Sequence, residues 1–155
     1  MVLTATRAYD ISSEPILKFF EERNFAFIST INKDGSPQVT PTWVDIDQED
    51  GLILINTAVG RLKQINVSRD PRVSISMIDG TNNPYSMVTI KGKVVEQSKN
   101  GADEHIDKLA RKYLSTDNYP NHSPGVTRII LKIKPEKILY LPPRYSQYLK
   151  NKEIS

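Results

Sequence analysis

The chain has 155 residues, of which 38% are hydrophobic and 25% are charged, and its formal net charge is +3. These values predict one soluble globular domain with its own core. Cysteine is absent and there are two histidines, which excludes disulfides and cysteine-ligated metal centres and disfavours an imidazole-rich metal site. No apolar run approaches the roughly 18 residues of a membrane span, and residues 1–15 contain no signal-peptide core. We therefore expect a cytoplasmic protein without a bound metal.

The first elements that the sequence predicts are a helix and a β-hairpin. Residues 12–24 carry apolar side chains at helical spacing, behind two serines that can cap the helix. Two strand-like runs follow, 25–32 and 37–47. The dipeptide Asp34-Gly35 between them is a strong hairpin signal.

The rest of the chain adds strands and two more helices. Further strands are predicted at 51–57, 72–79, 85–97 and 126–141, a short helix before Asp70 and Pro71, and a third helix at 101–114. Six closely spaced strands joined by tight turns favour an antiparallel barrel. We predict one domain over 1–141 and a polar tail over 142–155.

A short segment after the third strand carries cations where a helix start normally carries acids. The N-terminal end of a helix dipole is positive, yet Arg61 and Lys63 open this helix, and no acid lies between Gly51 and Arg69. One interpretation is a solvated helix face. We favour a phosphate site, because a bound anion would offset the repulsion between the cations and the dipole. Its predicted members are Asn56, Thr57, Ala58, Gly60, Arg61 and Lys63.

Residues 36–44 place two prolines in a strand-like run. Proline has no N–H to donate to a strand ladder, so the run is either an ordinary edge or bulged strand, or a bulged strand whose freed backbone groups face a flat ligand. Gln38, Thr40 and Thr42 alternate on one face and could supply polar contacts. Trp43, the single tryptophan, fits a core position better than a ligand platform.

The sequence offers no catalytic side chain. The acids between Asp45 and Asp50 are expected to be solvated turn residues, and neither His105 nor His122 has the context of a general base. If the protein is an enzyme, a cofactor supplies the reactive group.

Two motifs, taken together with their spacing, resemble one known family. The first is a D-G-x-P-x-x-x-P-x-W hairpin at 34–43, and the second is G-R-x-K-x-x-N-x-x-x-D-P-R-V at 60–73. The combination looks like the pyridoxamine 5′-phosphate oxidase-like split-barrel proteins, and it is closest to the subgroup that uses the deazaflavin coenzyme F-420. The resemblance covers residues 15–140. The substrate-phosphate motif of the true vitamin B6 oxidases is missing, so that activity is not expected.

The resemblance implies a mainly β fold, a six-stranded antiparallel split β-barrel of the FMN-binding split-barrel type. It also implies a homodimer with the cofactor in a groove at the interface. The cofactor phosphate would meet Arg61 and Lys63, and the ring would lie along the backbone of 38–42. The expected cofactor-binding residues are Gln38, Val39, Thr40, Pro41, Thr42, Asn56, Thr57, Ala58, Gly60, Arg61, Lys63 and Asn66.

The function that follows from this resemblance is hydride transfer between coenzyme F-420 and a small organic substrate. FMN is the alternative cofactor, and a non-catalytic flavin-binding or carrier protein is the alternative function. Arg69 and Arg72 extend the positive charge past Lys63, which would suit the long anionic tail of F-420, although both flank a helix end where solvated cations are common.

A nucleic-acid-binding barrel is disfavoured because no row of aromatics alternates with Lys and Arg. Neither nucleic acid nor a membrane is an expected partner.

Overall fold

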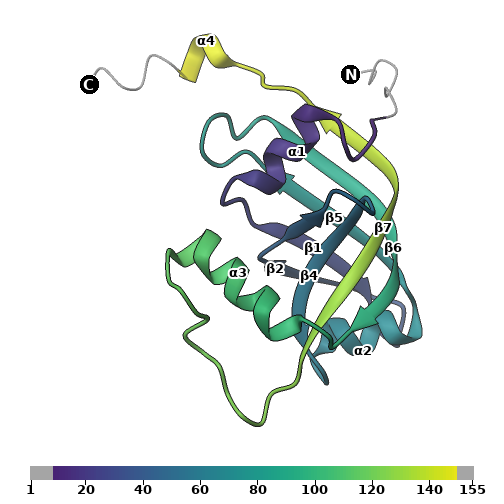
Figure 1. Cartoon of the computed structure of the whole chain (residues 1–155). Coiled ribbons are helices and arrows are strands. Elements are labelled where there is room, and N and C mark those ends of the chain that lie inside the picture. Colours follow the sequence, from purple (N-terminus) through teal and green to yellow (C-terminus); the bar gives the residue numbers. More distant parts are fainter. Residues whose placement is uncertain (1–8, 150–155) are drawn as a thin grey trace.

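Residues 9–149 are described by a computed structural model (Figure 1). Residues 1–8 and 150–155 lie outside the described part. The start of the predicted domain over 1–141 and the end of the predicted tail over 142–155 lie there too, and the boundary between domain and tail stays a prediction. The elements are α1 (Glu14–Glu21), β1 (Ala26–Ile31), β2 (Pro37–Thr42), β3 (Asp45–Asp47), β4 (Leu52–Ala58), α2 (Leu62–Arg69), β5 (Arg72–Ile78), β6 (Met87–Ser98), α3 (Ala102–Leu114), β7 (Arg128–Leu141) and α4 (Ser146–Leu149).

The strands form one antiparallel sheet in the order β2-β1-β5-β6-β7-β4-β3. The sheet curls around a core of branched aliphatic side chains, with α1, α2 and α3 at its margins (Figure 1). Fully buried members of this core include Ile28, Ile53, Ile55, Ile75, Ile90, Leu131 and Ile133. The predicted mainly β, antiparallel split-barrel fold is thus confirmed.

The sheet has seven strands where the sequence analysis counted six. The single strand predicted over 37–47 is two strands, because the chain leaves the ladder at Trp43 and Val44. There the Val44 N–H donates to the Tyr113 hydroxyl of α3 at 3.2 Å. β2 then pairs with β1 at one edge of the sheet, and β3 pairs with β4 at the other.

The prolines of β2 lie on a regular edge strand. The register with β1 runs without interruption from Ala26 opposite Thr42 to Ile31 opposite Pro37, so the proposed bulge is absent. Every second residue of a strand directs its N–H group to the same side. Pro37 and Pro41 are four residues apart, so the missing N–H groups fall on one side of β2. The other side, which is bonded to β1, keeps its donors. The edge-strand interpretation is confirmed.

The helices bury the faces that the sequence predicts. On α1 these are Ile16, Phe19 and Phe20, and on α3 they include Ile106, Leu109 and Ala110. Within residues 9–149, no helix has the length and apolar character needed to cross a membrane.

Candidate functional site: cations at the start of α2

The turn that leads into α2 uses the backbone N–H groups of residues 59–61 in its own hydrogen bonds. Gly60 has a φ of +87°, and its N–H donates to Oε1 of Gln64 at 2.9 Å. The N–H groups of Val59 and Arg61 donate to the carbonyls of Thr127 and Ala58. The donors that remain for a ligand belong to the first turn of the helix itself, since Arg61 makes no side-chain cap there.

Three cations converge beside this helix start. Lys63 is half-buried, and its pKa is lowered by burial and then by the neighbouring charges of Arg61 and Arg128. Burial also lowers the pKa of Arg128, which is 8% exposed. Among the described residues, none of the three forms an ion pair with a carboxylate. The cluster therefore has the charge of an anion site.

Arg128 is the member of this cluster that the sequence analysis missed. It opens β7, where the β4–β7 register sets it opposite Ala58. Its Nε donates to Oδ1 of Asn56 at 2.8 Å, and its guanidinium lies 5.3 Å from the ring centroid of Tyr119. No local motif marks Arg128, because the pairing that positions it joins residues about seventy positions apart.

The side chain of Asn56 is occupied by this network. Besides accepting from Arg128, its Nδ2 donates to the Ala102 carbonyl at 2.7 Å and lies 3.2 Å from Nδ1 of His105. The structure therefore gives Asn56 a role in positioning Arg128, whereas the sequence analysis placed it directly on the ligand.

Asp45 anchors the far end of the same network. Its Oδ2 is 3.2 Å from Nε2 of His105 and accepts from Nζ of Lys108 at 2.6 Å. Burial opposes ionisation of Asp45, but these two hydrogen bonds outweigh it and hold the pKa of the carboxyl well below its usual range. The expectation of a solvated turn acid is wrong for Asp45, which is 8% exposed, because α3 covers it.

Thr57 carries an orphaned polar atom next to the cations. Its hydroxyl is fully buried and, among the described residues, has no hydrogen-bond partner. An unsatisfied buried hydroxyl costs about 1–3 kcal/mol and often marks a ligand or water site. The neighbouring Ala58 is also buried, and its carbonyl accepts from the Arg61 N–H.

Asn66 connects the cation cluster to the predicted ring-binding strand. Its Nδ2 donates to Oγ1 of Thr30 at 3.0 Å and to Oδ1 of Asn32 at 2.9 Å, which ties α2 to β1. Thr30 in turn pairs with Gln38 of β2. The side chain of Asn66 is thus a structural link, and it brings the two halves of the predicted site together.

The residues of β2 alternate between two environments. Gln38, Thr40 and Thr42 are half-buried on the face that also carries the buried side chains of β1. Val39 and Pro41 are exposed on the opposite face. The ligand surface that β2 can offer is therefore its free edge together with this outer face.

Trp43 belongs to an aromatic group between β2 and Arg128. It is half-buried and stacks on Tyr113 at 5.2 Å with an interplanar angle of 5°, and it meets Tyr119 edge-on at 6.0 Å. The prediction of a core position is wrong, because β2 ends before Trp43 and the indole packs on α3 and the following loop. The loop between α3 and β7 also bounds a cavity of about 540 Å³, which Arg128 lines.

Residues 12–142 of the sequence match the pyridoxamine 5′-phosphate oxidase family. The chain belongs to this family. Over 140 residues it is 25% identical to F-420H(2)-dependent biliverdin reductase of Mycobacterium tuberculosis (strain CDC 1551 / Oshkosh), a match that covers 90% of this chain and 92% of that protein.

Solved structures of pyridoxamine 5′-phosphate oxidase-like proteins share the fold. An F-420 reductase superimposes with a TM-score of 0.67 at 25% identity, covering 78% of this chain and 93% of the other. A conserved hypothetical protein from Mycobacterium tuberculosis gives a TM-score of 0.66 at 24% identity and covers 91% of both chains.

The residues of this family member fit a phosphate-bearing cofactor. Arg61, Lys63 and Arg128 supply positive charge that forms no ion pair among the described residues, with the carboxylate of Asp103 near Arg128. The first turn of α2 supplies N–H donors, and Thr57 supplies a buried hydroxyl without a partner in the described part of the chain. This donor set suits the phosphate of a flavin-type cofactor.

Proposed function

We propose that this protein is an oxidoreductase that binds coenzyme F-420 and transfers a hydride between it and a small organic substrate. The observation that carries the proposal is the cluster of Arg61, Lys63 and Arg128, which has no carboxylate partner among the described residues. The F-420-dependent relatives add support for the deazaflavin over FMN.

The chain's own part in this reaction is to bind and orient. A bound deazaflavin supplies the hydride chemistry. Lys63 and Arg61 would hold the phosphate, and Arg128 presents a guanidinium whose direction is set by Asn56 and the ring of Tyr119. The free edge of β2 would lie along the ring.

A cofactor-centred mechanism agrees with the titratable groups near the site. Asp45 and His105 are buried and bonded to each other, and Lys108 also holds Asp45, so neither is free to act as a general base. The chemistry is therefore assigned to the cofactor, and the side chains are assigned to its placement.

Positive charge beyond the phosphate favours the longer cofactor. The sequence analysis looked to Arg69 and Arg72 for this charge, but Arg69 donates to the Ile31 carbonyl and Arg72 pairs with Asp70 at 2.7 Å. In the proposed site Arg128 takes their place. It lines, together with Asp103, the 540 Å³ cavity beside the cluster, and that cavity has room for an anionic tail.

The decisive experiment is mass spectrometry of the cofactor retained after native purification, followed by titration with F-420 and with FMN. Turnover is then measured with the preferred cofactor in its reduced form and with small unsaturated acceptors. Retained F-420 with turnover supports the proposal. Retained FMN would promote the flavin alternative, and tight binding without turnover on any acceptor would promote the carrier alternative.

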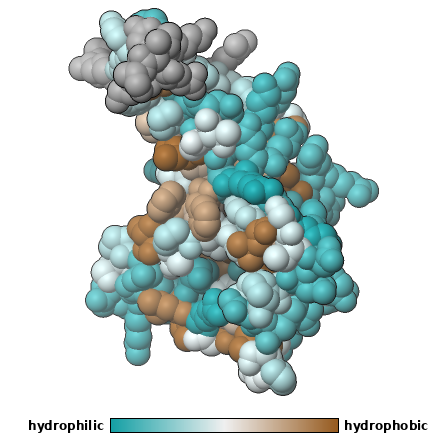
Figure 2. Space-filling model, turned by 90° about the vertical axis from the view of Figure 1, so that its left-hand side faces the viewer, coloured by the Kyte–Doolittle hydropathy of each residue, from teal (hydrophilic) through white to brown (hydrophobic). Residues whose placement is uncertain are grey.

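A homodimer completes the proposed groove. In one cross-strand row, Pro41, Phe27 and Ser76 lie side by side on the outer face of the sheet, and Val39 lies in the next row. Phe27 and Val39 are 43% and 54% exposed, and none of the four is charged. Figure 2 shows apolar patches among polar atoms on the side of the molecule that lies on the left of Figure 1, where α3 lies. A second copy that covered the face of Phe27 and Val39 would close the cofactor groove.

A further inference from the structure

A second cavity lies at the other end of the barrel from α2. It has a volume of about 670 Å³ and is bounded by α1, the loop between β5 and β6, and the chain just after β7. Figure 1 shows α1 and α2 at opposite ends of the sheet, so this cavity is separate from the cation cluster. Its volume falls in the range of small-molecule sites, about 300–1,000 Å³.

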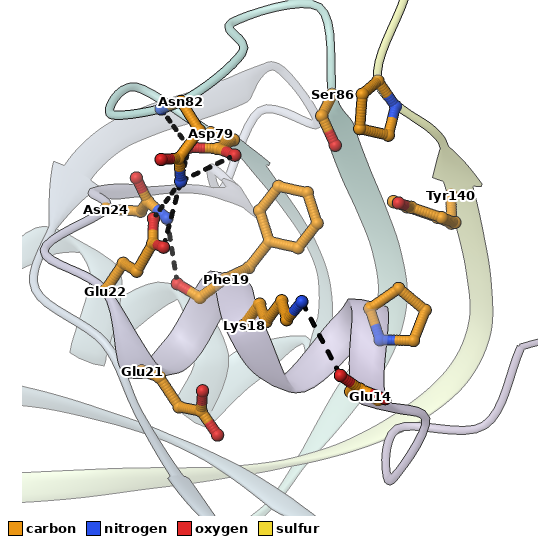
Figure 3. Close-up of a pocket in the computed structure, with 12 residues that line it drawn as sticks. Glu14, Lys18, Phe19, Glu21, Glu22, Asn24, Asp79, Asn82, Ser86 and Tyr140 are labelled. Atoms are coloured by element: carbon orange, nitrogen blue, oxygen red, sulfur yellow. Dashed lines mark hydrogen bonds and ion pairs between the residues drawn. The ribbon is translucent and has the colours of Figure 1, made fainter.

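Two aromatic side chains form one wall of this cavity. Phe19 is 3% exposed, and its ring meets that of Tyr140 edge-on at a centroid distance of 6.1 Å. Figure 3 shows both rings directed into the cavity, Phe19 from α1 and Tyr140 from β7. Because Phe19 belongs to the hydrophobic core, the half-buried ring of Tyr140 is the larger apolar surface that the pair offers to a ligand.

Ser86 points an unused hydroxyl into the same space. The residue is 3% exposed, and its backbone is fixed by hydrogen bonds to Asn83 and Asp79. Among the described residues, no partner accepts from or donates to the Ser86 hydroxyl, and Figure 3 shows it turned toward the cavity. Thr57 Oγ1 is the one fully buried side-chain polar atom without a partner among the described residues. The Ser86 hydroxyl therefore keeps access to the cavity, where a ligand can reach it.

The charge around the cavity is negative. Four carboxylates and one ammonium line it, and that ammonium, on Lys18, is 3.6 Å from Glu14. Glu22 and Asp79 instead share the side-chain amide of Asn82, which donates to both at 3.1–3.3 Å (Figure 3). Among residues 9–149, neither of these two acids has a cationic partner.

We propose that this cavity is a binding site for a small organic ammonium ligand with an apolar body. The ammonium would lie against Glu22 and Asp79, the body would pack on Phe19 and Tyr140, and the Ser86 hydroxyl would bond a polar atom of the ligand. A metal ion fits less well, since no group of three or more acidic or histidine side chains in the described chain is arranged to hold one.

The test is calorimetric titration of the full chain, without cofactor, with 2-phenylethylamine, 2-phenylethanol and phenylacetate. These probes share the aromatic body and differ in charge. We expect the amine to bind with a Kd of about 1 mM or tighter, the alcohol about ten-fold more weakly, and phenylacetate not at all. Equal binding of amine and alcohol, or no binding of the amine, overturns the proposal.

Two variants, Glu22→Gln and Ser86→Ala, test whether the amine binds in this cavity. Glu22→Gln keeps the acceptor for Asn82 but removes the charge, and we expect it to weaken amine binding about five-fold or more. Ser86→Ala should weaken it about three-fold. The matched control is Glu104→Gln on α3, which is exposed and outside the cavity. Thermal melts check that each variant folds. If Glu104→Gln weakens binding as much as Glu22→Gln, the effect is one of net charge and the site is wrong.

Discussion

Arg128 is held by neighbours from three separate parts of the chain. Asn56 on β4 accepts from its Nε, Tyr119 lies under its guanidinium, and Arg61 lies close enough to lower its pKa. A guanidinium fixed in this way loses little side-chain freedom when it binds a phosphate. The cluster also explains why Lys63 has a lowered pKa, since burial and two cationic neighbours all disfavour its charged form.

The first residue-scale prediction concerns Lys63→Ala. We expect it to weaken the binding of both F-420 and FMN about ten-fold or more, because a charge-assisted phosphate contact is worth roughly 1.5–3 kcal/mol. Folding should be little changed, since removing Lys63 relieves repulsion with Arg61 and Arg128. Calorimetry with both cofactors measures the effect, and Lys137→Ala, an exposed change on β7, is the control. Unchanged affinity in Lys63→Ala would show that the phosphate lies elsewhere.

The second residue-scale prediction concerns Asp45→Asn and pH. The folded pKa of Asp45 is depressed, so its stabilisation is fully present above the unfolded pKa of about 3.9 and is lost as the pH falls below it. We expect Asp45→Asn to be less stable than the wild type at pH 7, with the difference narrowing steadily below about pH 4. Urea denaturation from pH 7 to pH 2.5 measures both. A difference that stays constant over this range would contradict the network.

At the scale of elements, polar side chains attach α2 to the sheet: Asn66 and Arg69 bond to the β1 segment, and Gln64 and Ser68 bond to Gln97 of β6. The helix has few buried residues, and those are Asn66 and Val67. Asn66 reaches Thr30 and Asn32 on and after β1, so one amide joins the cationic helix to the hairpin that carries β2. The sequence motif contains this asparagine, but its spacing alone could not distinguish a ligand contact from a link between elements.

We therefore expect Asn66→Ala to destabilise the fold. The loss should be about 1–3 kcal/mol in the free energy of unfolding, because Thr30 would keep a buried hydroxyl without its donor. Asn100→Ala, at an exposed asparagine before α3, should change stability by less than about 0.5 kcal/mol. Chemical denaturation at pH 7 compares the two. If both variants change the free energy of unfolding equally, the hydrogen bonds of the Asn66 amide do not stabilise the fold.

At the scale of the whole molecule, the outer face of β1, β2 and β5 has the character of an interface. Val39 and Phe27 stand exposed there beside small hydroxyl residues and prolines, and β2 is an edge strand with free backbone groups. Exposed edges of this kind are normally covered or charged in monomeric proteins. In the proposed site, one copy of the chain would cover a flat cofactor on one side only.

We expect the protein to be a dimer in solution, with a mass twice the 17.6 kDa of one chain. Phe27→Asp should shift it to the monomer and weaken cofactor binding, because a charge would be buried in the interface. Val95→Asp, at an exposed valine of β6, is the control. Light scattering at micromolar concentration decides the matter. A wild-type monomer that still binds cofactor tightly would refute the shared groove.

The proposed preference for F-420 over FMN also belongs to the whole molecule, because the charges that would produce it come from the α2 segment and β7. Since F-420 has an anionic tail beyond its phosphate, part of the preference is electrostatic. We expect this preference to be smaller at high salt than at low salt, because the Debye length is shorter at high salt. Parallel titrations of both cofactors at two ionic strengths measure it. Tighter FMN binding at both salts would reverse the choice of cofactor.

The sequence by itself determined the fold class, the hairpin at Gly35, the buried faces of α1 and α3, and the cations at Arg61 and Lys63. These features depend on neighbours within a few positions, where periodicity, turn chemistry and the helix dipole act. The tertiary structure decided the rest. It split the strand over 37–47, buried Asp45 beneath α3, and brought Arg128 to Ala58 through a pairing between strands far apart in the chain. Such contacts depend on how the sheet closes, and no local pattern encodes that.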